Sequence, residues 1–360
     1  MNTETEARTL FYGGQPGGTH GWGVCNRHLI QELGKLTTLT PLAEGSPLWT
    51  STALPGNLFT PVGNHELAPV TPARGSKNLG YTFFEAEPNQ RSVENAKRFD
   101  VLFAGSSWCV ERMNAHGIRH SIVLVQGVDG RIFRPRAAKR ADGKFRIFSG
   151  GKFELRKGQD LVLRAFRVLH QKYPDMVLVT AWYNHWPQLM ALMARAPDIR
   201  FELIQGSWVE QMEHVYRING IDPARVLTVP LASQEQMAEV YRESDIGLFP
   251  NRCEGGTNLV LMEYLACGRP AIVSHGTGHR DVVNEKNSLL LRRLQPLNIK
   301  GPNGVMAARW LEPTLDEIIS QLEFAYLNRS KAEELGRQAA EDMKQWTWER
   351  AAKTILAHTT

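Results

Sequence analysis

Residues 148–158 read FSGGKFELRKG, and this stretch decides the fold of the second half of the chain. An apolar run ends at the glycines, and residues 159–172 then place apolar side chains on one helical face. A strand, a glycine turn and an amphipathic helix in this order predict a βαβ unit, whose ligands bind at the carboxyl end of the strand. We therefore expect Lys152 and Lys157 to form an anion site there, with a solvated basic turn as the alternative interpretation.

Short apolar runs alternate with amphipathic stretches through most of the chain, which predicts an α/β protein with mostly parallel sheets. The predicted strands cover residues 9–12, 81–84, 101–104, 146–149, 176–182, 226–229 and 246–249. The predicted helices cover residues 24–33, 159–172 and 235–243, and a strap of helices runs from Thr314 to the end. Residues 42–76, rich in Pro, Gly and Thr, are expected to be loop with marginal strands.

The length of 360 residues is enough for two domains. Residues 130–144 form a basic stretch with Pro and Gly but no periodicity, which we interpret as the linker between them. The predicted division is a first Rossmann-like domain over residues 1–138 and a second over residues 139–343. A C-terminal helix at about residues 344–360 is assigned to the first domain.

Residues 250–263 read PNRCEGGTNLVLME and supply a second group of candidate site residues. The glycines precede a predicted helix that stops near Gly268, and glycines in this position let backbone N–H groups approach a phosphate or a developing negative charge. Glu254, at the turn, is placed to accept hydrogen bonds from sugar hydroxyls. Glu263 falls within an apolar helix, where its carboxylate needs a partner. A ribose diol and a core Arg are the two interpretations.

Residues 17–23 read GGTHGWG and lie between the first predicted strand and the first predicted helix. A glycine turn in this place brings the backbone against a ligand. The match to G-x-G-x-x-G is incomplete because Asn26 stands where the third Gly is expected, and a flexible connection is the alternative. Taken together, the cations of one motif and the carboxylates of the other describe a site for a ligand that is anionic at one end and a polyol at the other.

The bulk composition is that of an ordinary soluble protein, with a net charge of +5 and 42% hydrophobic residues. It gives no reason to expect a nucleic-acid partner. No run approaches about 18 apolar residues and the first residues lack the apolar core of a signal peptide, so we expect a cytoplasmic protein. The four cysteines show no metal-ligand spacing and no Asp-x-Asp triplet occurs. We therefore expect no metal site and favour a metal-independent mechanism.

On these residues the chain resembles the retaining GT-B glycosyltransferases of family 4, the group 1 glycosyl transferases. Residues 100–107 and 127–135 resemble the end of that family's first lobe. Residues 151–158 resemble its diphosphate-binding motif and residues 254–273 its paired-glutamate motif, while the tail around Trp348 is similar to a helix that crosses back. The resemblance implies a GT-B architecture, in which two Rossmann-like doubly wound domains face a central cleft and the C-terminal helix returns to the first domain.

The resemblance also implies roles for individual residues. Lys152, Lys157 and Glu254 would be the catalytic residues, the lysines neutralising the diphosphate and the glutamate holding the transferred sugar. Glu263 would bind the ribose. Further contacts to the donor would come from Gly21, Gly23, Gly151, Gly255, Gly256, Thr257 and Asn258. Charge that develops on the leaving diphosphate would be taken up by the cations and the amides.

Two departures from the family pattern accompany this resemblance. The family usually places seven residues between the two glutamates, whereas this chain has eight, and the extra one is expected in the turn at residues 255–258. Many members carry a His after the strand that here reads Phe83-Phe84-Glu85, and this chain has no obvious equivalent. Glu85 and His20 are candidates for contacts to the acceptor or the sugar. The alternatives are a surface carboxylate and an incidental loop histidine.

The expected activity is transfer of a hexose from a nucleoside-diphosphate sugar to an acceptor, with retention of anomeric configuration and without a cofactor. The acceptor stays open among a glycan, a lipid-linked sugar and a small molecule, as does peripheral contact with the inner membrane face. Two alternatives stand beside this hexosyltransferase. One is a nucleotide-sugar epimerase of the same fold, and the other is a non-catalytic homologue that binds a nucleotide or a partner protein.

Overall fold

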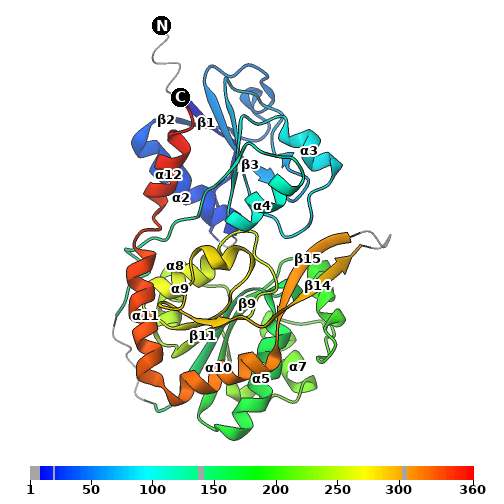
Figure 1. Ribbon diagram of the computed structural model, residues 1–360, viewed down its shortest axis with the longest axis vertical. Coiled ribbons are helices and arrows are strands. Elements are labelled where there is room, and N and C mark those ends of the chain that lie inside the picture. The colour runs from blue at the N-terminus through cyan, green and yellow to red at the C-terminus, as the bar shows by residue number, and fades with distance from the viewer. Residues whose placement is uncertain (1–8, 19–20, 137–141, 302–305) are drawn as a thin grey trace.

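The computed structural model describes residues 9–18, 21–136, 142–301 and 306–360, which form two lobes, each built on a mostly parallel sheet (Figure 1). The strands of the first lobe follow the order β2-β1-β3-β5-β6-β7, and β4 pairs antiparallel with β3. Their bounds are β1 Thr9–Tyr12, β2 Thr38–Pro41, β3 Asn57–Gly63, β4 Ala68–Pro69, β5 Asn78–Thr82, β6 Val101–Ala104 and β7 Ser121–Val123. The helices of this lobe are α2 Gly21–Leu36, α3 Gln90–Ala96 and α4 Ser107–Ala115, with a 3₁₀ turn η1 at Pro47–Thr50.

The sheet of the second lobe is parallel throughout, in the order β10-β9-β8-β11-β12-β13. Its strands are β8 Phe145–Lys152, β9 Met176–Tyr183, β10 Val226–Thr228, β11 Ile246–Phe249, β12 Ala271–Ser274 and β13 Leu289–Leu291. A separate antiparallel hairpin consists of β14 Leu294–Lys300 and β15 Met306–Pro313. The helices of this lobe are α5 Gln159–Lys172, α6 Pro187–Met190, α7 Trp208–Ile218, α8 Gln234–Arg242, α9 Leu259–Ala266, α10 Leu315–Leu327 and α11 Arg329–Met343, and the last helix of the chain is α12 Trp348–Leu356. The 3₁₀ turns are η2 Leu155–Lys157, η3 Ala191–Arg195, η4 Pro223–Arg225 and η5 Thr277–Asp281.

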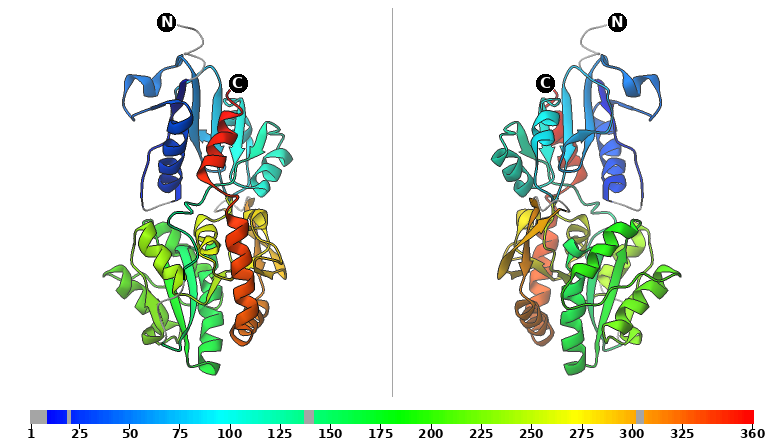
Figure 2. Two further views of the ribbon diagram at one scale, coloured as in Figure 1. Left: turned by 90° about the vertical axis from the view of Figure 1, so that its left-hand side faces the viewer. Right: turned by 90° about the vertical axis from the view of Figure 1, so that its right-hand side faces the viewer.

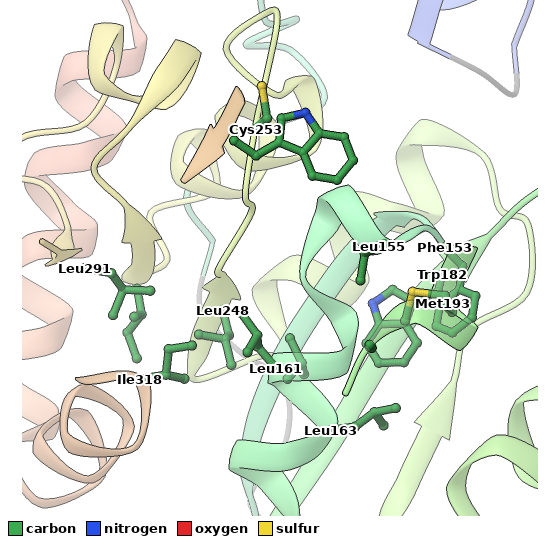
Figure 3. Close-up of a cluster of buried hydrophobic side chains, with 14 of the residues drawn as sticks. Phe153, Leu155, Leu161, Leu163, Trp182, Met193, Leu248, Cys253, Leu291 and Ile318 are labelled. Atoms are coloured by element: carbon green, nitrogen blue, oxygen red, sulfur yellow. The ribbon is translucent and has the colours of Figure 1, made fainter. Parts of the chain in front are cut away.

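Apolar side chains that alternate along the strands of the second lobe form a core on each face of its sheet. Leu248 of β11 packs with Leu161 of α5 and Ile318 of α10 on one face, and these side chains point toward one another in Figure 3. Phe249, the next residue of β11, packs with α8, α9 and α11 on the other face. The sheet therefore has helices on both faces, the arrangement in which ligands bind beyond the carboxyl ends of the strands.

The chain crosses between the lobes a second time after α11. Figures 1 and 2 show α11 along the second lobe and α12 beside α2 on the first. Trp348 and Ile355 of α12 are buried in the same core as Leu29 of α2. The predicted return of the C-terminal helix is confirmed. The predicted domain boundary between residues 138 and 139 lies outside the described residues.

Several predicted elements match the structure residue for residue, among them β1, β6, α5 and β11. The prediction of loop with marginal strands at residues 42–76 was wrong. β3 lies within this range as a buried seven-residue strand between β1 and β5. Pro61 is tolerated in it because the ladder with β1 ends at Phe59, so the missing N–H removes no bond on that side.

Two further elements differ from the prediction. β5 begins at Asn78 and ends at Thr82, so residues 83–85 follow the strand instead of completing it. The hairpin of β14 and β15 was not predicted, because its strands pair only with each other and β14 contains no buried residue. It reaches the first lobe, where the N–H of Glu87 donates to the carbonyl of Ala307 at 2.9 Å.

Candidate functional site

The two motifs that the sequence singles out lie side by side, because β8 and β11 are neighbouring strands whose carboxyl ends meet at one edge of the sheet. Gly158 has a φ of 73°, and a Cβ there would come within 2.3 Å of the Pro250 carbonyl oxygen. The N–H of Arg252 donates to the carbonyl of Arg156 at 2.8 Å. Segments about a hundred residues apart in the sequence are therefore held in direct backbone contact.

Lys157 and Glu254 form the centre of the site. The ammonium of Lys157 donates to Oε1 of Glu254 at 2.6 Å, and the amide of Asn251 donates to the same oxygen. Burial alone would raise the pKa of Glu254, but the Lys157 and Arg156 cations outweigh it and lower that pKa to about 2. Glu254 is therefore an ionised carboxylate at neutral pH, and it lies between cations at the carboxyl ends of the strands.

Arg156 connects this centre to the first lobe. Its guanidinium lies 3.3 Å from Oε2 of Glu254, 3.4 Å from Oε1 of Glu85 and 2.5 Å from Oε1 of Glu154. Burial opposes the charge, yet the three carboxylates raise the pKa of Arg156 well above its ordinary value. Glu85, which the sequence analysis proposed as a contact to acceptor or sugar, thus shares a cation with Glu254 across the cleft.

The turn at residues 255–258 presents backbone amides. Gly255 packs on the first lobe, since a Cβ there would meet the Phe84 carbonyl oxygen at 2.3 Å. The side chain of Thr257 turns away toward the sulfur of Met262, at 2.9 Å. Across the described ranges, no protein acceptor receives a hydrogen bond from the N–H groups of Gly255, Gly256, Thr257 and Asn258. These donors precede α9, so the turn can bind an anion or an oxygen that gains negative charge.

Asn258 and the segment behind it hold the turn in place. Asn258 adopts a φ of 65°, its side chain accepts from the N–H of Leu261, and its amide lies 3.2 Å from Nε2 of His279. Burial lowers the pKa of His279 to about 4, although the nearby Glu254 carboxylate acts to raise it. The imidazole is therefore neutral at neutral pH. Gly278 is required here, because a Cβ would come within 1.8 Å of the Gly256 carbonyl oxygen. The turn at residues 255–258, where the extra residue between the two glutamates is expected, thus contains a residue with a positive φ.

A cavity of about 250 Å³ lies between the first turn of α2 and the ends of β8 and β9. Lys152 lies at this cavity and not at the Lys157 cluster, with its ammonium 4.7 Å from the centre of the Trp186 ring. Most of the wall is apolar or aromatic. The residues that line the cavity include Gly21, Gly151, Trp182, Tyr183, Trp186, Gln234, Met237, Tyr241 and Glu263. A planar apolar group and a short polar segment fit such a cavity.

Glu263 lines the same cavity and is 7% exposed. Its carboxylate accepts from the Gln234 amide at 3.1 Å and from the Tyr241 hydroxyl at 3.3 Å. Among the described residues its hydrogen-bond partners are therefore neutral, and the predicted core Arg is not one of them. Burial raises the pKa of Glu263 to about 8, with Gln234 and Tyr241 opposing the shift.

The remaining predicted site residues are three glycines and one histidine. Gly21 lines the cavity, whereas Gly23 packs on Gly17, whose Cα would lie 2.8 Å from an added Cβ. Gly151 has a φ of 116° and stands against Lys157, whose Nζ would lie 4.0 Å from an added Cβ. His20 lies outside the described residues.

Sequence reasoning missed four residues that shape this site: Arg156, Asn251, Thr277 and His279. Arg156 stands inside the quoted first motif beside Lys157, and a count of every cation in that motif would have included it. Thr277 accepts a hydrogen bond from the N–H of Glu254 at 2.9 Å and adopts a φ of 47°. It lies far along the chain, where no local pattern links it to Glu254.

Two findings on the described residues concern metal and membrane. No group of three or more His, Cys, Asp or Glu side chains among them could hold a metal ion. None of the helices in these ranges is both long and apolar enough to cross a bilayer. Metal independence itself stays a prediction.

Comparison with known proteins finds a family model that matches the part of the chain that contains both motifs. Residues 131–292 match the family model described as Glycosyl transferases group 1. The D-inositol 3-phosphate glycosyltransferase of Mycolicibacterium smegmatis is 28% identical over 240 residues, with 65% of this chain and 46% of that protein covered. The protein of the same name from Arthrobacter sp. (strain FB24) is 24% identical over 245 residues, covering 66% and 49%. The chain spans about half the length of the curated relatives it matches.

Solved structures agree over nearly the whole chain. Sucrose-phosphate synthase from Thermosynechococcus elongatus superposes with a TM-score of 0.65 at 14% identity, covering 97% of each chain. Anabaena HepE in complex with UDP and glucose superposes with a TM-score of 0.64 at 11% identity, covering 98% of this chain and 99% of that one. These likenesses concern the fold, and the predicted GT-B architecture is confirmed.

Proposed function

We propose that this chain, whose residues 131–292 belong to the group 1 glycosyltransferases, transfers a hexose from a nucleoside-diphosphate sugar to a hydroxyl-bearing acceptor. The observation that carries the proposal is the pairing of Lys157 with Glu254 beside a turn of unpartnered amides, next to an aromatic-walled cavity. A cation, amide donors and a carboxylate suit the diphosphate and the sugar hydroxyls of one ligand. The cavity suits its nucleoside.

The nucleoside end of the donor would enter the cavity of about 250 Å³. The base would pack against the aromatic wall around Trp186, where a planar ring finds apolar faces. Glu263 would accept hydrogen bonds from the ribose hydroxyls, in the place where Gln234 and Tyr241 already orient its oxygens. Lys152 lies at the same cavity, which puts its charge near the start of the diphosphate.

The diphosphate would reach from Lys152 toward Lys157 along Gly151, whose lack of a side chain keeps that path open. Glu254 neutralises the Lys157 ammonium in the structure. When the donor binds, the diphosphate would take over this cation, and the Glu254 oxygens would become available to sugar hydroxyls. The two residues would thereby change partners together, without leaving a buried charge unpaired.

The chemical step is then stabilisation of a leaving group. As the bond between the anomeric carbon and the β-phosphate oxygen breaks, the electron pair stays on the diphosphate. Lys157, Lys152 and the amides before α9 would carry the added negative charge in a site shielded from water. The acceptor oxygen would form the new glycosidic bond, and its proton would pass to an oxygen of the departing diphosphate. Retention of configuration is proposed from the family resemblance.

The experiment that tests the proposal is calorimetric titration of the purified protein with UDP, GDP and ADP, without added metal. We expect micromolar binding of one nucleotide, and loss of that binding in Lys157→Ala. Analysis of products with the matching nucleotide sugar then separates transfer from epimerisation. Absence of binding to all three nucleotides would contradict the proposal and favour a non-catalytic homologue.

Glu263→Gln is expected to change how stability depends on pH. In the folded protein burial raises the pKa of Glu263 to about 8, whereas the unfolded chain ionises near 4.5. Between these values the unfolded state has lost the proton that the folded state retains, so stability falls as pH rises. Gln carries no such charge. We expect the wild type to lose about 4 kcal/mol of stability between pH 4 and pH 8 that the variant retains, and the variant to be no more stable than the wild type at pH 4. Thermal unfolding at both pH values measures this difference.

The same variant should bind the free nucleotide about tenfold more weakly at pH 8, because an ionised acceptor for the ribose hydroxyls is lost. The matched control is Glu349→Gln on α12, whose carboxylate is exposed and pairs with Lys353. An equal gain in stability at pH 4 and pH 8 would contradict the assignment of Glu263.

A further inference from the structure

A loop of the first lobe supports the turn at residues 255–258. The loop consists of Gly105 and Ser106, between β6 and α4, and Figure 1 shows α4 at the edge of the first lobe that faces the second. A Cβ on Gly105 would lie 3.1 Å from Cα of Gly256, so the two backbones pack directly on each other. The turn whose amides we assign to the leaving diphosphate therefore rests on the other lobe.

Ser106 ties this loop to the carbonyl of Gly255. Its hydroxyl donates to that oxygen at 2.6 Å, and Ser106 is 0% exposed. The Cys109 thiol contacts the Ser106 hydroxyl and lies 3.0 Å from the same Gly255 oxygen, and the Phe84 carbonyl, at 3.5 Å, is a second acceptor for it. A hydroxyl is a stronger donor than a thiol, so Ser106 does most to fix the direction of the Gly255 carbonyl.

The direction of this carbonyl decides where the next amide points. A peptide group is planar and trans, so the carbonyl of Gly255 and the N–H of Gly256 point in opposite directions. Ser106 stands on the carbonyl side, and the N–H of Gly256 therefore points away from it. Within the described ranges that N–H meets no protein acceptor. The hydrogen bond at the carbonyl also polarises the peptide group, which makes its N–H a stronger donor.

We propose that Ser106 is a positioning residue of the donor site: it holds the peptide between Gly255 and Gly256 so that the N–H of Gly256 donates to an oxygen of the β-phosphate. This inference rests on the proposed function. It makes the first lobe a part of the diphosphate site, although Ser106 itself touches no substrate. A nucleoside monophosphate has no β-phosphate, so its binding should not depend on Ser106.

The test is Ser106→Gly, with Ser207→Gly as the matched control. Both serines cap a helix, and each hydroxyl accepts a hydrogen bond at 3.3 Å from the N–H three residues later, that of Cys109 or of Glu210. Glycine is nearly as good as serine at this position of a helix, so α4 keeps its start. Of the two serines, only Ser106 donates to a carbonyl of the other lobe.

Calorimetry then compares UDP with UMP, GDP with GMP, and ADP with AMP. For the base that the wild type binds, Ser106→Gly should bind the diphosphate roughly tenfold more weakly and the monophosphate as tightly as the wild type does. Unchanged binding of the monophosphate also shows that the variant is folded and that its nucleoside cavity is intact. Ser207→Gly should bind both nucleotides as the wild type does.

Two results would overturn the inference. Wild-type affinity of Ser106→Gly for the diphosphate would mean that the amide needs no support from the first lobe. An equal loss of diphosphate and monophosphate binding would mean that Ser106 maintains the fold of the site as a whole. If glycine prevents folding, Ser106→Ala removes the same hydroxyl and repeats the comparison. Failure of the wild type to bind any of these nucleotides is a distinct result, which removes the proposed function and this inference with it.

Discussion

Lys157→Met is expected to lower kcat/KM for sugar transfer by about a thousandfold, which corresponds to about 4 kcal/mol of lost transition-state stabilisation. Lys157 is the cation that stands between the first motif and Glu254, at 2.6 Å from its carboxylate. In the proposed reaction it neutralises the diphosphate most strongly when the glycosidic bond is breaking. Both kcat and the affinity for the donor should therefore fall. Steady-state kinetics with donor concentration varied measure the two effects.

A purely structural role for Lys157 predicts a different pattern. If it serves only to neutralise buried Glu254, the double variant Lys157→Met with Glu254→Gln should recover binding of the free nucleotide, which does not involve Glu254, since no charge is then left unpaired. We expect no recovery. Lys172→Met, which removes an exposed lysine paired with Glu323, is the matched control and should have wild-type kinetics. Recovery in the double variant would contradict the diphosphate role.

The sequence predicted that the two motifs form one site. Their relative position depends only on which strands are neighbours in the sheet. β8 and β11 are buried on both sides, and such strands are apolar runs followed by glycine turns. Once they are neighbours, Lys157 and Glu254 at their ends must lie close together. Local pattern therefore sufficed for these two strands and for the centre of the site, although it did not indicate the hairpin of β14 and β15.

The neighbours of each carboxylate could not be predicted in the same way. Glu263 is paired with Gln234 and Tyr241, which lie on a different helix about twenty to thirty residues away, and polar residues on a helix surface carry no mark of what they contact. Lys152 was grouped with Lys157 on sequence proximity. The two lysines lie apart because Lys152 is the last residue of β8 and lines the cavity. Lys157 ends the 3₁₀ turn η2, which places it beside Glu254.

The first lobe was harder to predict than the second. β3 contains Pro61 and ends in Gly, residues that argue against a central strand. It is a strand because Leu58 and Phe59 are buried between β1 and β5, a tertiary context that outweighs local propensity.

Arg252→Met is expected to destabilise the protein by about 4 kcal/mol, the largest stability effect that we expect of a substitution beside the site. Arg252 is two residues before Glu254, and its guanidinium donates to both oxygens of Asp160 at 2.7 Å. It also donates to Glu312 at 2.5 Å and to the Leu155 carbonyl at 2.6 Å. Arg252 and Asp160 are each 1% exposed, so removing the cation leaves a buried carboxylate unpaired.

The double variant Arg252→Met with Asp160→Leu separates the charge effect from packing. Apolar replacement of a whole buried ion pair is often neutral, so we expect most of the lost stability to return. Sugar transfer should stay impaired, because Arg252 also ties η2 and β15 to the turn that carries Glu254, and methionine restores none of those bonds. Thermal unfolding should show a melting temperature roughly 10 °C lower in the single variant and near the wild type in the double one. A single variant as stable as the wild type would contradict the burial of this pair. Full activity in the double variant would mean that the position of Glu254 does not depend on Arg252.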